Sequence, residues 1–199
     1  MDSHLRIAVA DDDPRIRRFY SEILPRLGHV LTCLVDNGRD LVRQCEASPP
    51  DLVITDIRMP GGDGIEAVHE LCSCRAVPVI LVSAYHEPEL LERAKYEHIL
   101  VYLLKPVKQA DLKTAISIAM ERFGQFQALR DEAGRLRQEL EDRKLIERAK
   151  GIIMKKAGLD EPTAFSRLRK LARENNEKMI EVARMVIRAE EAFETASVR

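Results

Sequence analysis

Tryptophan is absent from this 199-residue chain, and aromatic residues make up only 5% of it. No apolar run approaches the roughly 18 residues that a membrane-spanning helix needs. The N-terminus leads directly into an apolar, strand-like run without the features of a secretory signal peptide. We therefore expect a cytoplasmic protein with no membrane partner. Its 45% hydrophobic content is enough to bury a core in one or two domains.

Cysteine is also scarce. Cys33, Cys45, Cys72 and Cys74 lie in or beside apolar segments without the paired spacing of a metal site, so buried or incidental thiols are expected. His69 is close in sequence to the last two, but a closed zinc site needs a fourth ligand that nothing nearby supplies. The cysteines therefore give no reason to expect a zinc site.

The first 123 residues alternate apolar runs with amphipathic stretches. Runs rich in β-branched residues occupy residues 5–10, 30–35, 52–56, 77–82 and 99–104. Residues at helical spacing follow each run, most weakly at Leu90, Leu91 and Ala94. This alternation predicts an α/β fold, a flavodoxin-like doubly wound parallel sheet of five strands in the order 2-1-3-4-5.

Residues with carboxylate, hydroxyl or ammonium side chains lie where the strands are expected to end. They are Asp11, Asp12, Asp56, Ser83 and Lys105. The carboxyl ends of parallel strands open on the same edge of a sheet, so these residues should converge. Three carboxylates repel each other unless a cation neutralises them, and an all-oxygen set suits Mg²⁺. A hydroxyl, an ammonium and a divalent ion are what a transferring phosphoryl group needs. We therefore interpret Asp56 as a nucleophile that accepts a phosphoryl group.

Residues 5–123 resemble the receiver domain of two-component response regulators. The resemblance rests on the order and spacing of Asp11-Asp12, Asp56-Ile57-Arg58-Met59-Pro60, Asp63-Gly64, Ser83, Tyr102 and Lys105-Pro106. It implies a sensor histidine kinase as phosphoryl donor, and slow hydrolysis of the phosphoryl group as the receiver's only chemistry. It implies no small-molecule substrate.

The same resemblance assigns roles to individual residues. The Mg²⁺ ligands would be Asp11, Asp12, Asp56 and the backbone carbonyl of Arg58. Ser83 and Lys105 would hold the phosphoryl oxygens, and Ser83 and Tyr102 would move on phosphorylation. The Lys105–Pro106 peptide bond is expected to be cis.

The segment 124–142 carries a heptad pattern that continues the last receiver helix. Apolar residues recur at the two seam positions, which predicts a coiled-coil linker and a parallel homodimer. The expected seam residues are Phe126, Leu129, Ala133, Leu136 and Leu140. Gly124 and Gly134 weaken the pattern, each by up to about 1 kcal/mol. The alternative is a single long helix that packs on its own domain.

Residues 143–199 predict a small all-α domain of three helices. Between residues 143 and 188 there are 13 Lys or Arg against 6 Asp or Glu, a balance that suggests a polyanion partner. The segment lacks His, Cys and a Gly-rich phosphate loop, so we expect no second enzyme.

The run Ala149–Met154 (A-K-G-I-I-M), with Ala164-Phe165, Leu168-Arg169 and Val182-Ala183, resembles the ANTAR domain, the RNA-binding output module of transcription antitermination regulators. The resemblance implies binding to hairpins in nascent leader transcripts. The expected RNA contacts are Lys150 first, then Arg148, Gly151, Arg169 and Arg173. Two alternatives remain: a helix-turn-helix that binds duplex DNA, and a bundle that binds another protein.

Overall fold

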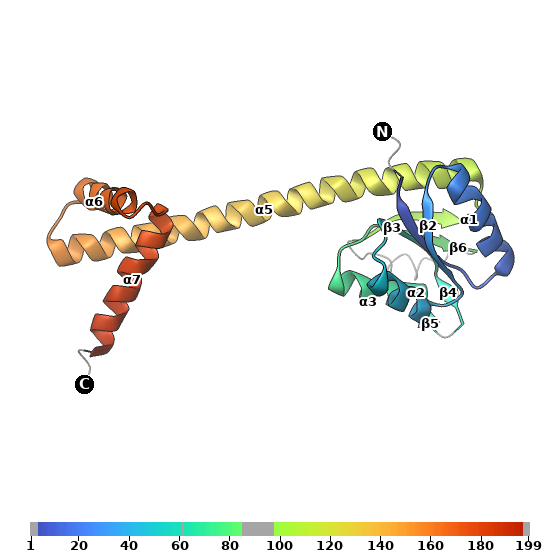
Figure 1. Cartoon of the computed structure of the whole chain (residues 1–199), viewed down its shortest axis with the longest axis horizontal. Helices are drawn as coiled ribbons and strands as arrows, with labels where there is room; N and C mark the ends of the chain where they lie inside the picture. The colour runs from blue at the N-terminus through green and yellow to red at the C-terminus, as the bar shows by residue number, and fades with distance from the viewer. Residues whose placement is uncertain (1–3, 61, 85–97, 197–199) are drawn as a thin grey trace. The chain divides into compact units, whose positions relative to one another are not determined.

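The first unit of the protein contains the expected parallel sheet. A computed structural model describes residues 4–60, 62–84 and 98–196. The strands are β1 (Arg6–Ala10), β2 (Val30–Val35), β3 (Leu52–Asp56), β6 (Val79–Ser83) and β7 (Ile99–Leu104). They are parallel and lie in the order β2-β1-β3-β6-β7 (Figure 1), which confirms the predicted order. The helix expected around Leu90, Leu91 and Ala94 lies outside the described residues.

Helices cover both faces of this sheet. They are α1 (Pro14–Arg26), α2 (Gly38–Ala47), α3 (Gly64–Cys74) and the first turns of α5 (Gln109–Ala157). Each of the first three begins at a side-chain cap: the side-chain oxygens of Asp13, Asn37 and Asp63 accept hydrogen bonds from backbone N–H groups of the first turn. Polar side chains in the loops therefore fix where these three helices begin.

The alternation of side chains along the strands divides the core in two. Ile7, Val9 and Ile54 pack with α1 and α5 on one face, whereas Ala8 and Val53 pack with α2 and α3 on the other. All residues of β3 and β6 are buried, as expected for central strands of a doubly wound sheet. The carboxyl ends of these strands are therefore held rigidly.

A small antiparallel pair, which the sequence pattern did not reveal, follows β3. Its strands are β4 (Arg58–Met59) and β5 (Gly62–Asp63). Gly64 then comes so close to β3 that an added Cβ would lie 1.9 Å from the backbone oxygen of Asp56. Only glycine fits there, because no side chain can share that space with a backbone atom.

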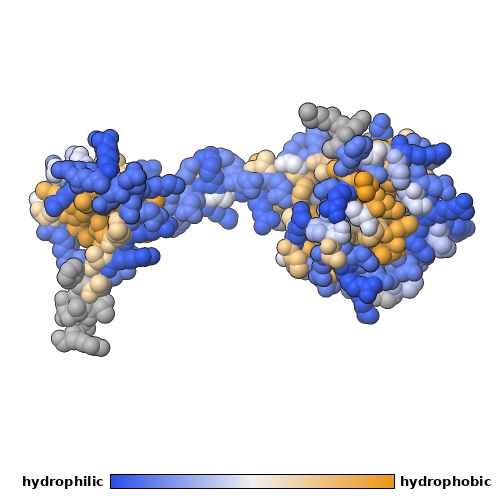
Figure 2. Space-filling view, viewed as in Figure 1, coloured by the Kyte–Doolittle hydropathy of each residue, from blue (hydrophilic) through white to orange (hydrophobic). Residues whose placement is uncertain are grey.

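Helix α5 is a single helix of 49 residues. It contains the last receiver helix, the linker and the first helix of the output domain, and the boundary between the two compact units falls between Ala128 and Leu129. Hydrophilic residues cover most of its middle part in the view of Figure 2. Leu129, Leu136 and Leu140 are nevertheless 70%, 51% and 54% exposed. The linker leucines therefore do not pack on a described part of their own chain.

The second unit is the expected three-helix bundle. The end of α5 packs with α6 (Glu161–Glu174) and α7 (Met179–Ala196) around a core of small and branched residues: Ala149, Leu168, Ala172, Val182, Ala183 and Ile187. The turns on either side of α6 use Gly158 and Asn176, both with positive φ. None of the described helices is both long enough and apolar enough to cross a membrane.

The close approach at Gly64 gives a test of the fold. Gly64→Ala should lower the free energy of unfolding by at least the upper end of the about 1–3 kcal/mol typical of overpacking, because backbone must move. Gly124→Ala is the matched control, since an added Cβ there meets nothing within 4 Å; it should raise stability by up to about 1 kcal/mol. Urea unfolding followed by circular dichroism measures both. Equal effects of the two substitutions would contradict this packing.

Candidate functional site

The residues expected to converge do meet at the carboxyl edge of the sheet. Asp11 follows β1, Asp56 is the last residue of β3 and Ser83 is the last residue of β6. Carboxylate oxygens of Asp11, Asp12 and Asp56 lie within 4.8 Å of one another, and this is the one such group of three possible metal-binding side chains in the described part of the chain. Three oxygen ligands at this spacing, with the exposed Asp12 leaving room for water, fit the preferences of Mg²⁺.

Lys105 lies between the two buried carboxylates. Its Nζ is 2.8 Å from Oδ2 of Asp11 and also makes a short ion pair with Oδ2 of Asp56. The side chains of Asp11 and Lys105 are only 1% and 17% exposed, so the ion pairs are shielded from water. The backbone N–H of Lys105 donates to the carbonyl of Ser83 (2.8 Å), which places the ammonium and the hydroxyl at one edge.

Backbone hydrogen bonds hold the acidic loop and the end of β3. The Arg17 guanidinium donates to the carbonyls of Asp11 (2.8 Å) and Asp12 (2.9 Å). The N–H of Arg58 donates to Oδ1 of Asp56 at 3.2 Å. The positioning role of Arg17 was missed by the sequence reasoning, because an arginine on the first turns of a helix carries no signal of what it reaches.

Burial and ion pairing act in opposite directions on the charges of the pocket. Burial raises the pKa of Asp11, although hydrogen bonding and Coulomb attraction from Lys105 partly offset this. Burial alone would lower the pKa of Lys105, but hydrogen bonds from its ammonium to Asp11 and Asp56 outweigh this effect and raise it. The pocket therefore holds the charged ammonium of Lys105 beside the carboxyl group of Asp11, whose ionisation is made less favourable by burial.

The predicted switch residues Ser83 and Tyr102 lie in the neighbouring strands β6 and β7. Ser83 is buried and Tyr102, in β7, is half-buried against the α2–α3 side of the core. Arg58 is exposed and begins β4. The Lys105–Pro106 peptide bond is cis.

The cysteines take the structural places expected of them. All four are free thiols; Cys45 is buried, and Cys33 and Cys72 are half-buried. A hydrogen bond from Cys45 to Cys33 lowers the pKa of Cys33. The cluster of His69, Cys72 and Cys74 does not form a metal-binding group among the described residues.

In the output bundle, some cationic side chains form ion pairs between helices, and others are exposed and form none with a described residue. Lys150, the first candidate for an RNA contact, has a side chain only 8% exposed, and its Nζ pairs with Glu147 (2.8 Å) and Glu161 (2.7 Å). The hydrogen bond to Glu147 is the main cause that raises the pKa of Lys150. The same ammonium lies 5.8 Å from the centre of the Phe165 ring. Lys150 therefore links α5 to α6 through its ion pair with Glu161.

Two further cations of α5 make bonds between helices of the bundle. Arg148 pairs with Glu191 of α7 at 2.9 Å, and Lys156 pairs with Glu190 of α7 at 3.2 Å. These contacts were invisible in the sequence because their partners lie more than 30 residues away.

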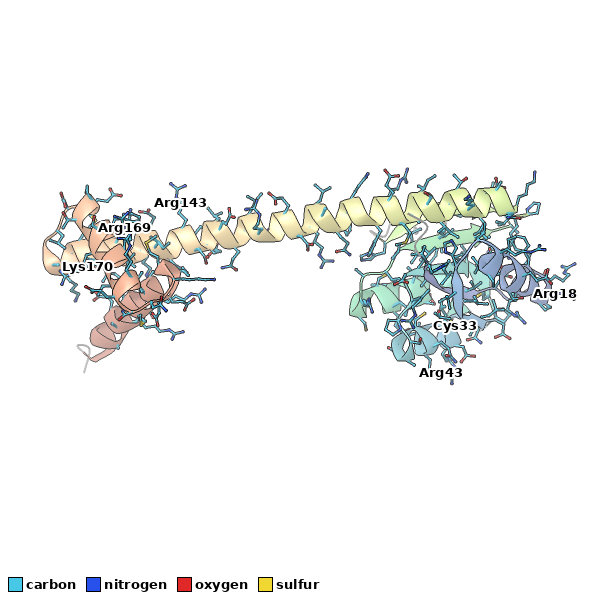
Figure 3. All side chains as sticks on the ribbon, turned by 45° about the horizontal axis from the view of Figure 1, so that its top comes forward. Arg18, Cys33, Arg43, Arg143, Arg169 and Lys170 are labelled. Carbon is cyan, nitrogen blue, oxygen red and sulfur yellow. The ribbon has the colours of Figure 1, made fainter. Side chains whose placement is uncertain are left out.

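Other cationic side chains of the bundle form no ion pair with another described helix. Arg169 and Arg173, one turn apart on α6, are exposed and make no ion pair with a described residue. Figure 3 shows Arg169 and Lys170 projecting from α6, and Arg143 projecting from α5. Gly151 is exposed, and an added Cβ would meet nothing within 4 Å. Packing within the described part of the chain therefore does not require glycine at this position.

Comparison with known proteins matches both units. The family model described as response regulator receiver domain covers residues 7–117, and the ANTAR domain model covers residues 134–187. The transcriptional regulatory protein PdtaR of Mycobacterium tuberculosis is 37% identical over 182 residues, spanning 92% of this chain and 89% of the relative. The positive alginate biosynthesis regulatory protein of Pseudomonas aeruginosa is 31% identical over 117 residues, 58% of this chain and 47% of that protein.

Solved structures match the first unit. The signal receiver domain of the response regulator NarL from Mycobacterium tuberculosis superposes with a TM-score of 0.56 at 25% identity. The match covers 60% of this chain and 98% of that structure.

The raised pKa of Asp11 predicts how stability depends on charge in the pocket. A folded-state pKa above the ordinary value of 3.8 means that the folded state binds more protons, so stability falls as pH rises from 3.8 through the folded-state pKa. Asp11→Asn removes this cost and should raise the melting temperature by a few degrees at neutral pH without Mg²⁺. The control Glu46→Gln alters an exposed carboxylate on α2 and should not. Calorimetry at neutral pH and near pH 3.5 measures both; an equal gain at the two pH values would contradict the assignment.

Proposed function

The chain belongs to the response regulators that join a receiver domain to an ANTAR domain, and on this premise we propose how its residues carry out phosphorylation-controlled transcription antitermination. Asp56 accepts the phosphoryl group, and the bundle formed by the end of α5, α6 and α7 binds RNA hairpins of nascent leader transcripts. The observation that carries the first part is the contact of one ammonium, Lys105, with both Asp11 and Asp56.

The geometry of the pocket supports phosphoryl transfer to Asp56. A carboxylate oxygen of Asp56 attacks the phosphorus of a phosphohistidine on a sensor kinase; the new O–P bond forms as the P–N bond breaks, and the imidazole leaves with the bonding electrons. Lys105 moves from the carboxylate to a phosphoryl oxygen, a short displacement because it already touches Asp56. The Ser83 hydroxyl donates to a second phosphoryl oxygen.

Asp11, Asp12, Asp56 and the backbone carbonyl of Arg58 are the residues that would hold Mg²⁺. When bound, the ion neutralises the charge that builds up on the phosphoryl oxygens. The arrangement of the protein supports this assignment, because Asp11 and Asp56 are fixed by backbone hydrogen bonds whereas Asp12 remains exposed. No separate catalytic output domain is needed for the receiver to hydrolyse its phosphoryl group slowly.

On the output side, the exposed cations without carboxylate partners are the ones that fit RNA phosphates. Arg169 and Arg173 meet this condition, and the open backbone at Gly151 lets a phosphate chain approach α5 closely. Lys150 and Arg148 act instead by holding α6 and α7 against α5. The ion pairs of Lys150 support a structural role for it, which we propose in place of the RNA contact expected from the sequence.

A homodimer joins two such bundles. The exposed leucines of the linker form a stripe at heptad spacing, with Ala133 between them, and burying them against a second copy removes apolar surface from water. Phe126 is only half-buried by its edge-to-face contact with His98 of the receiver (5.9 Å between ring centres). We place the boundaries at residues 1–123 for the receiver, 124–142 for the linker and 143–199 for the output domain.

The acceptor assignment is tested by chemical phosphorylation. Acetyl phosphate with Mg²⁺ should add one phosphoryl group to the wild type and none to Asp56→Ala, as intact-mass spectrometry would show, because the substitution removes the attacking oxygen. Asp40→Ala, which removes a partly exposed carboxylate on α2, is the control and should be labelled like the wild type. Equal labelling of Asp56→Ala would rule out Asp56 as the acceptor.

The RNA assignment is tested by replacing the exposed arginines and the ion-paired Lys150 in separate variants. Replacing Arg169 and Arg173 together by alanine should lower affinity for a two-stem-loop leader RNA more than about tenfold and reduce the salt slope by about two per protomer. The bundle should still melt as in the wild type. Lys150→Ala should instead lower the melting temperature, because Glu147 and Glu161 lose their shared partner.

Gel shifts at two salt concentrations, with duplex DNA of equal length as competitor, measure the affinities. Arg18→Ala, on the receiver, is the control for loss of an exposed arginine and should leave RNA binding unchanged. A preference for duplex DNA would contradict RNA as the ligand.

A further inference from the structure

The charges beside the linker stripe specify how two copies associate. With Ala133 and Leu140 at seam position a and Leu129 and Leu136 at position d, the flanking g positions hold Glu132 and Glu139, and the flanking e positions hold Arg137 and Lys144. In a parallel dimer each g residue meets the e residue five places later in the partner helix, which pairs Glu132 with Arg137 and Glu139 with Lys144. An antiparallel dimer would place acid against acid and base against base.

The pairs within one chain do not prevent this arrangement. Glu132 and Glu139 both pair with Arg135 on the outer side of the same helix, and Lys144 pairs with Glu141. All of these side chains are more than half exposed, and exposed pairs are worth at most about 1 kcal/mol. Arg137 has no ion-pair partner among the described residues, so it is available to a second helix.

Arg143 occupies the next d position, where the apolar stripe ends. It is exposed, projects from α5 (Figure 3) and makes no ion pair with a described residue. Its neighbours Leu145 and Ile146 turn into the core of their own bundle. Glu147, the nearest carboxylate on the C-terminal side, is already bound to the shielded ammonium of Lys150.

From these positions we infer that Arg143 of two copies forms a phosphate-binding site on the axis of a parallel dimer, and that an RNA phosphate occupies it. This inference rests on the proposed RNA-binding function. Position d of one helix faces position d of its partner, so the two guanidinium groups meet at the point where the bundles begin. Each copy supplies half of the site.

Two facing guanidinium groups repel each other. A phosphate bound between them attracts both, so the net electrostatic interaction across the dimer axis becomes favourable. Each guanidinium can donate two parallel hydrogen bonds to phosphate oxygens. RNA and the second protein copy then strengthen each other's binding by the same factor, because linkage is reciprocal. Dimerisation through the linker is thereby coupled directly to occupancy by RNA.

The test compares Arg143→Leu with the wild-type full-length protein, both before and after treatment with acetyl phosphate and Mg²⁺. Leucine extends the apolar stripe and removes the repulsion, so the dimer without RNA should become at least about tenfold tighter in sedimentation equilibrium. The same variant should bind a two-stem-loop RNA more weakly, with a salt slope reduced by about one because the single phosphate on the dimer axis is no longer neutralised. A substitution that merely disturbed the fold would weaken both.

Arg130→Gln is the matched control, because it removes an arginine from an e position whose partner in a parallel dimer is the uncharged Gln125. Arg130→Gln should change neither the affinity of the dimer nor the affinity for RNA by more than about twofold, because an exposed charge contributes little free energy. If Arg143→Leu fails to tighten the dimer, Arg143 does not lie on the seam and the inference is wrong. If the dimer tightens while RNA affinity and salt slope stay unchanged, the phosphate site is refuted but RNA binding stands; absence of RNA binding in the wild type would refute the proposed function itself.

Discussion

The ammonium of Lys105 lies between the carboxylates of Asp11 and Asp56, and the chemistry of the receiver depends on this contact. Two buried carboxylates repel each other, and burial already raises the pKa of Asp11. The Lys105 ammonium offsets this repulsion and lies directly beside the proposed acceptor. The central strands bring the acids to one edge, and the hydrogen bond from Lys105 to the carbonyl of Ser83 adds the hydroxyl. The parallel sheet thus assembles a reactive site from residues almost 100 positions apart.

Helix α5 belongs to both compact units. Its first turns place Leu112, Ala115 and Ala119 in the receiver core, and its last turns place Ala149 in the core of the bundle. No described part of the chain buries the leucines of the stretch between them, so this apolar surface is open to the second copy that we propose. Association through this stretch, as proposed, involves residues of neither core.

Ion pairing within the bundle decides which cations remain for a ligand. Lys150, Arg148 and Lys156 each neutralise a carboxylate on another helix, so they contribute to holding three short helices together. Arg169, Arg173 and Arg143 have no such partner among the described residues. Only part of the positive charge of the bundle is therefore used in these ion pairs, and the rest is what we propose for phosphate binding.

Local patterns in the sequence were enough to determine the strand order, the continuous linker helix and the convergence of Asp11, Asp56, Ser83 and Lys105. The strand order is that of the flavodoxin-like folds indicated by the alternation of strands and helices. The continuous helix follows from periodicity, and the convergence follows from the rule that parallel strands end on one edge. The roles of Arg17 and Lys150, and the short β4–β5 pair, were decided only by the tertiary structure. The direction of a long flexible side chain depends on partners brought close by folding, here the carbonyls of the acidic loop and a glutamate on the next helix, and spacing along the chain does not encode them.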